Sequence, residues 1–109
     1  MTVQALQENM EEKPPLIWRR VFDNQNNLRG WLVATRIANK AYVGWSYCCN
    51  QDRVKFDKQF GKNLALQRMV VGSNKALHRN VKRVLPAFEQ QVRKTFKEVE
   101  SVELVKRNV

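Results

Sequence analysis

Hydrophobic and polar residues alternate along the segment 28–38, where Trp31 and Val33 share one side of an extended chain. A period of two residues is typical of a β-strand with one buried face. The segments 16–22 and 41–48 have a similar character, and short polar stretches that favour turns separate the three segments. The pattern therefore predicts three consecutive strands that pair as an antiparallel meander.

After residue 52 the hydrophobic period becomes that of an α-helix, and residues 53–71 form the first predicted helix. Asp52 is placed to cap the first turn of this helix, and Gly72 is placed to end it. Gly61 and Ala65 share one flank, where their small size would let another backbone come close. The expected core stripe of this helix consists of Phe56, Phe60, Leu64 and Val71.

A second predicted helix begins with Ser73 or Asn74 as its cap and continues to about Val84. Pro86 suits the first turn of a third helix, although the same residues also fit one longer helix that is kinked at Pro86. Residues 102–105 fit a short final strand. The expected core positions of the third helix are Phe88, Val92, Phe96 and Val99.

These elements predict an α+β fold in which a three-stranded antiparallel meander packs against two or three helices. We expect residues 1–15 to form a flexible N-terminal arm and residues 16–109 to form one domain. The first 15 residues lack the apolar run of a signal peptide, and no segment approaches the roughly 18 apolar residues that cross a membrane. We therefore expect a cytoplasmic protein without a membrane partner.

Positive charge is concentrated in the middle of the chain. Twenty Lys and Arg residues face ten Asp and Glu residues, which gives a formal net charge of +10. Between Arg53 and Arg83 there are nine basic residues and one acidic residue, Asp57. Such a field attracts polyanions and speeds their capture, so an acidic partner is expected.

The basic residues of the predicted helices are the candidate binding site for nucleic acid. If the first two helices pack as an antiparallel pair, their lysines and arginines form one positive surface that can contact successive phosphates. Trp31 and Trp45 are expected in the core, whereas Tyr42 is expected to expose its ring for stacking on bases. The predicted nucleic-acid-binding residues are Lys55, Lys58, Lys62, Arg68, Lys75, Arg79, Lys82, Arg83 and Tyr42.

The side chains that catalysis or metal binding requires are sparse in this sequence. His78 is the one histidine, and it is expected to be an ordinary surface residue. Cys48 and Cys49 are adjacent, which disfavours a disulfide between them, although the thiol that points outward can be reactive. No Gly-rich phosphate loop is present. We therefore expect no enzymatic activity, no catalytic residues, no metal site and no cofactor.

Trp45-Ser46-Tyr47-Cys48 forms a strand end with the pattern Trp-Ser-x-Cys. In this stretch the sequence resembles small accessory proteins of tailed bacteriophages. Residues 56–68 match the helix pattern Phe-x-Lys-x-x-Gly-x-x-x-Ala-x-x-Arg that follows it in those proteins, with a longer loop here after Asp52. The resemblance implies a phage origin, hence the cytoplasm of a host cell, and an accessory task such as counter-defence or host takeover. It also marks Lys58 and Arg68 as polar positions of interest.

Together these features predict a small basic protein that binds nucleic acid, with RNA slightly preferred over DNA because exposed rings and basic residues suit flexible strands. One alternative is a protein-binding inhibitor that docks on an acidic host enzyme or defence factor, with tryptophans as anchors. Another is a structural component that packages nucleic acid. The same positive charge motivates all three hypotheses.

Overall fold

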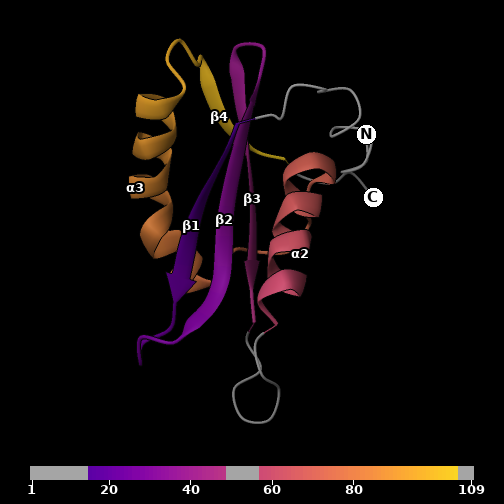
Figure 1. Ribbon diagram of the computed structural model, residues 1–109, viewed down its shortest axis with the longest axis vertical. Coiled ribbons are helices and arrows are strands. Elements are labelled where there is room, and N and C mark those ends of the chain that lie inside the picture. The colour runs from indigo at the N-terminus through magenta and orange to yellow at the C-terminus, as the bar shows by residue number, and fades with distance from the viewer. Residues whose placement is uncertain (1–14, 49–56, 106–109) are drawn as a thin grey trace.

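A four-stranded sheet forms the centre of the computed structural model, which describes residues 15–48 and 57–105 (Figure 1). Its strands follow the order β1-β2-β3-β4, and the first three pair antiparallel as the alternation predicts. The strands are β1 (Leu16–Phe22), β2 (Leu28–Ile37), β3 (Lys40–Tyr47) and β4 (Ser101–Leu104). The predicted arm 1–15 lies outside the described residues except for Pro15.

The sheet has a fourth strand that the prediction of a three-stranded meander does not include. β4 pairs with β3 in parallel, with Lys40 opposite Ser101 and Val43 opposite Leu104. A parallel neighbour requires a long crossover connection, so the turn signals that identify hairpins do not predict it. The sequence pattern indicates a short strand near this position, but it contains no information about the strand's partner.

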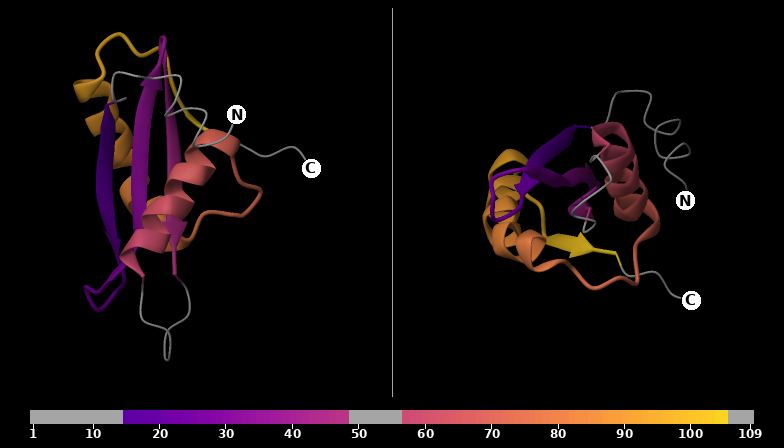
Figure 2. Two further views of the ribbon diagram at one scale, coloured as in Figure 1. Left: turned by 45° about the vertical axis from the view of Figure 1, so that its right-hand side comes forward. Right: turned by 90° about the horizontal axis from the view of Figure 1, so that it is seen from below.

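Two helices, α2 (Lys58–Val71) and α3 (Arg79–Thr95), cover opposite faces of the sheet (Figures 1 and 2). The segment that joins them passes beside β4, where the backbone N–H of Ser73 donates to the carbonyl oxygen of Val105 at 3.1 Å. The antiparallel helix pair, which is the condition for one joint positive surface, is therefore not found. Each helix instead buries its apolar side against its own face of the sheet.

Helix α2 begins later than predicted and buries a different side. Asp57 is the N-cap, and its carboxylate accepts the backbone N–H of Phe60 at 3.0 Å. The predicted cap, Asp52, lies outside the described residues. Phe60 is 66% exposed, so the predicted core stripe is wrong. The residues that α2 buries are Gly61, Ala65 and Met69.

Close backbone contact explains why this side of α2 faces the sheet. A Cβ atom at Gly44 of β3 would lie only 1.9 Å from the carbonyl oxygen of Ala65 and 2.5 Å from the backbone nitrogen of Met69. The helix therefore lies directly on the β3 backbone, and no side chain fits at position 44. The expected close approach at Ala65 is confirmed, and this close contact leaves no room for a phenylalanine stripe.

Helix α3 is one continuous helix, which is the alternative in which Pro86 lies inside the helix. Its cap is His78 rather than Ser73 or Asn74. Proline has no backbone N–H, so α3 lacks one helical hydrogen bond at this position. Pro86 is exposed, so this gap lies on the solvent side of the helix. The predicted core stripe is confirmed, because Phe88 and Val92 are fully buried. The apolar core between α3 and the sheet includes Val21, Leu32, Val43, Trp45, Val81, Phe88, Val92 and Phe96.

A second, smaller core lies between the sheet and α2. It contains Trp31, Val33, Ala65 and Met69. Trp31 and Trp45 are 6% and 7% exposed, so the prediction that both rings are buried is confirmed. They belong to different cores. Trp45 lies opposite Leu32 in the sheet, and Leu32 and Trp31, as neighbours along β2, point to opposite faces.

Candidate nucleic-acid interface

The outward side of α3 carries the main group of positively charged side chains. The helical spacing of these residues places them opposite the buried stripe that contains Val81, Phe88 and Val92. Glu89 is the one acidic residue of this helix, and it is half-buried. The cations of the outward side are all exposed: Arg79, Lys82, Arg83, Arg93, Lys94 and, directly after the helix, Lys97.

These α3 cations are not neutralised by nearby carboxylates. Within residues 15–48 and 57–105, the one ion pair joins Arg29 to Asp23, with 3.2 Å between Nε and Oδ2. That pair joins the turn after β1 to the start of β2 and involves no residue of α3. Between residues 79 and 100, six cations therefore face three carboxylates, Glu89, Glu98 and Glu100, none of which forms an ion pair with them, and the excess charge is positive.

Two of the predicted cations of α2 are instead held by tryptophans. The Nζ atom of Lys62 lies 4.8 Å from the ring centre of Trp31 and 5.3 Å from that of Trp18. The guanidinium of Arg68 lies 4.2 Å from the ring centre of Trp45 and donates to its backbone oxygen at 3.2 Å. Burial lowers the pKa of Arg68 from its ordinary value. Both side chains therefore brace α2 on the sheet.

The predicted joint surface of the two helices does not exist. Lys58 and Lys75 are exposed, but Lys58 begins α2 on the face of the sheet opposite α3, and Lys75 lies in the connecting segment. Lys55 lies outside the described residues. Tyr42 is half-buried against the core that contains Trp31 and Val33, so its ring is less exposed than expected. Arg79, Lys82 and Arg83 are the predicted residues that the structure brings together.

An open groove of about 550 Å³ follows the free edge of β1 beside the first half of α3. Along β1, Arg19 shares the α3-facing side with Ile17 and Val21, whereas Trp18 packs toward Trp31 on the other side. Because residues of both sides contribute, the groove lies along the unpaired strand edge itself. Its lining includes Trp18, Arg19, Arg20, Phe22, Asn80 and Arg83.

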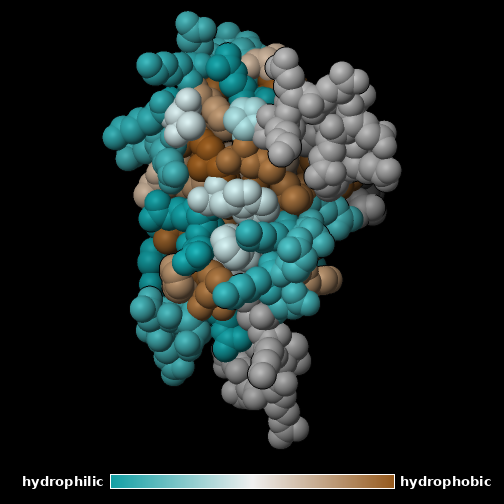
Figure 3. All heavy atoms as spheres, viewed as in Figure 1, coloured by the Kyte–Doolittle hydropathy of each residue, from teal (hydrophilic) through white to brown (hydrophobic). Residues whose placement is uncertain are grey.

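The space-filling view shows two hydrophobic patches between the hydrophilic outer sides of the two helices, with a paler and more hydrophilic band between them (Figure 3). The strand register shifts between Val21 and Phe22, so that Phe22 pairs with Leu28. Phe22 remains 42% exposed at the end of the strand, within the groove. The groove thus combines exposed aromatic surface with three arginines, a composition suited to bases and phosphates.

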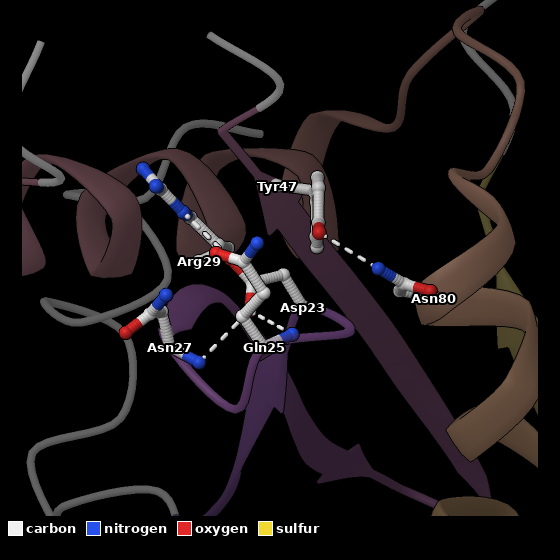
Figure 4. Close-up of polar contacts among 6 residues, drawn as sticks. All are labelled: Asp23, Gln25, Asn27, Arg29, Tyr47 and Asn80. Atoms are coloured by element: carbon white, nitrogen blue, oxygen red, sulfur yellow. Dashed lines mark hydrogen bonds and ion pairs between the residues drawn. The ribbon is translucent and has the colours of Figure 1, made fainter. Parts of the chain in front are cut away.

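Asp23, which also lines the groove, is fixed by its own turn (Figure 4). Its Oδ1 atom accepts the backbone N–H groups of Gln25 and Asn27, each at 2.9 Å, and its Oδ2 atom pairs with Arg29. The hydrogen bond from Asn27 is the main cause that lowers the pKa of this carboxyl below 3.8. Because these partners compensate the carboxylate, it does not cancel the groove's arginines.

A small polar cluster joins the start of α3 to β3 (Figure 4). The Nδ1 atom of His78 accepts the backbone N–H of Asn80 at 3.1 Å, and the imidazole stacks on Tyr47 with ring centres 3.8 Å apart. Asn80 donates from Nδ2 to the Tyr47 hydroxyl at 2.8 Å. Burial, aided by Arg79, lowers the pKa of His78. The expectation that His78 is an ordinary surface residue is therefore wrong.

Several residues of this interface are absent from the sequence-based prediction. Arg93, Lys94 and Lys97 follow the Phe88–Val92 stripe, so the helical period alone would have placed them opposite the core. Arg19 and Arg20 carry no such signal, because the sequence does not show that β1 is an edge strand. Trp18 and Phe22 likewise look like ordinary strand residues.

The described residues contain no cluster of three or more His, Cys, Asp or Glu side chains that could hold a metal ion. Cys48 is half-buried, and Cys49 lies outside the described residues. Neither described helix is long and apolar enough to cross a membrane. No protein-family model, curated protein or solved structure matches this chain. The resemblance to bacteriophage accessory proteins therefore stays a prediction.

Proposed function

We propose that this protein binds nucleic acid, and RNA in preference to DNA, with the outward side of α3 lying along the phosphate backbone. The observation that carries the proposal is the set of six exposed cations on and directly after α3, with no carboxylate paired to any of them in the described residues. Seventeen helical residues span about 25 Å, which is long enough to lie beside several phosphates.

Counterion release would supply most of the affinity of such a surface. With six phosphate contacts, the logarithm of the binding constant for a single strand should fall with the logarithm of salt concentration with a slope of about −4. The groove beside α3 supports binding of unpaired strands, the form in which proteins most often recognise RNA, because exposed aromatic and arginine side chains suit flexible strands.

The test is a salt-titrated binding assay with single-stranded RNA, single-stranded DNA and duplex DNA. We expect the double variant Lys82→Glu/Lys94→Glu to lose about 100-fold in affinity at low salt, because each reversal replaces a phosphate contact with repulsion. The matched control is Lys58→Glu/Lys75→Glu, which changes the net charge equally away from the outward side of α3. Measured at the same salt concentration, the control should lose less than about fivefold, because salt weakens the effect of charges that lie far from the contacted phosphates.

Equal losses in the two double variants would show that only net charge matters and would contradict the assignment to α3. Equal affinity for RNA and DNA strands would contradict the RNA preference. Absence of binding to all three nucleic acids would overturn the proposal and favour the acidic-protein partner instead. A pull-down with and without nuclease would then identify that partner class.

A further inference from the structure

The groove along β1 is distinct from the outward side of α3, although Arg83 contributes to both. Three guanidinium groups line it, from Arg19, Arg20 and Arg83. The one carboxylate of the lining, Asp23, already accepts two backbone N–H groups and pairs with Arg29. The charge left for a ligand is therefore positive, and guanidinium groups bind phosphate through paired hydrogen bonds.

Aromatic surface lies within the same groove. Phe22 is 42% exposed, and Trp18 is half-buried with its ring edge-to-face against Trp31 at 5.8 Å between ring centres. Lys62 lies over the Trp18 ring on the side of α2. A planar base placed against these rings would cover apolar surface that is now exposed to water.

Asn80 adds a polar group that has one unused hydrogen-bonding atom. The residue is 4% exposed, lines the groove and donates from Nδ2 to the Tyr47 hydroxyl. Its Oδ1 atom is buried and has no hydrogen-bond partner in the structure. Asn80 therefore places at the wall of the groove a carboxamide whose oxygen is not used as an acceptor within the described residues.

From these three features we infer that the groove holds one unpaired nucleotide of an RNA strand. Its phosphate binds arginines of the lining, its base packs against the aromatic side chains, and the Asn80 carboxamide lies at the wall beside it. The inference rests on the proposed function and adds selection for single strands. A duplex keeps its base faces stacked inside, so it can contact α3 but cannot fill the groove.

Two matched pairs of variants test the groove against single-stranded RNA and an RNA duplex of equal length. Phe22→Ala should weaken single-strand binding about tenfold and leave duplex binding within twofold. Phe60→Ala removes an equally large but more exposed ring outside the groove and should change neither. Arg83→Ala should weaken single-strand binding more than duplex binding, whereas Arg93→Ala, on the same helix but outside the groove, should weaken both equally.

A second measurement uses NMR titration of the wild-type protein with adenosine monophosphate and, separately, with inorganic phosphate. The nucleotide should shift the Asn80 side-chain amide and the Trp18 indole signals, and phosphate alone should shift only the arginine signals. Thermal melts of each variant confirm that the fold is retained.

The possible failures are distinguishable. If the wild-type protein binds no RNA at all, the proposed function fails. If it binds RNA but Phe22→Ala and Phe60→Ala behave alike on single strands, the groove assignment is wrong and the α3 proposal stands. If phosphate reproduces every shift that the nucleotide causes, the groove is an anion site without base recognition, which also contradicts the inference.

Discussion

The two helices cover the same sheet by different means, and this difference decides what their charges can do. Helix α2 lies close on the β3 backbone where Ala65 and Met69 face Gly44, and two of its cations lie over tryptophan rings. Helix α3 packs through large apolar side chains and directs its cations to solvent. A count of lysines and arginines therefore overestimates the positive charge that is available to a partner, since contacts within the fold already use some of these side chains.

The largest expected effect tests how α3 packs. Phe88→Ala should lower the free energy of unfolding by about 3–5 kcal/mol, because it leaves a cavity in the core where Phe88 is fully buried. Urea denaturation measures the loss. Phe60→Ala, at an exposed position of α2, is the control and should stay within about 0.5 kcal/mol of the wild type. A loss below 1 kcal/mol for Phe88→Ala would mean that α3 does not depend on this core.

A substitution that adds volume, rather than removing it, tests the contact between α2 and β3. Gly44→Ala adds one methyl group where Ala65 and Met69 leave no space, so it should cost about 1–3 kcal/mol of unfolding free energy. Ser46→Ala, on the same side of β3, is the control. Its buried Oγ atom has no hydrogen-bond partner, so removing it should cost little. Unchanged stability in Gly44→Ala would show that α2 does not lie on the strand backbone.

The smallest expected effect distinguishes the caps of the two helices. Protonation of His78 at Nδ1 removes the acceptor that caps α3, and burial already lowers its pKa below 6.5. The unfolded chain then binds a proton that the folded chain does not, so stability present above pH 6.5 should fall as pH drops below it. Thermal melts between pH 5 and 7 measure this slope. His78→Asn keeps a side-chain acceptor that does not titrate, and it should remove the slope. If the dependence of stability on pH is unchanged in that variant, His78 is not its cause.

The sequence predicts α3 better than α2 because the two buried sides differ in chemistry. Phe88 and Val92 stand out as large apolar residues at helical spacing, and they are buried as expected. On α2 the buried side contains Gly61 and Ala65, whose weak hydrophobicity hides it from a periodicity argument. Phe60 is strongly hydrophobic and still exposed. The close packing of Ala65 and Met69 against Gly44 turns the other side of α2 toward the sheet, and this packing outweighs the free energy that burial of the Phe60 ring would contribute.

The candidate site depends on tertiary information that local patterns lack. Arg79, Lys82 and Arg83 are predicted and lie on the outward side of α3. The partner assigned to them, α2, lies on the other face of the sheet, and hydrophobic periodicity does not specify which face a helix takes. The groove could not be predicted either, because it requires β1 to be an edge strand and α3 to lie beside it.

The parallel pairing of β4 with β3 also has a consequence for folding speed. The hairpins β1–β2 and β2–β3 join neighbours in the chain, whereas β4 reaches β3 only after the chain has passed through both helices. Closing so long a loop costs configurational entropy before any of its hydrogen bonds form. The chain should therefore fold more slowly than a meander of equal length, with β4 joining the sheet in a late step.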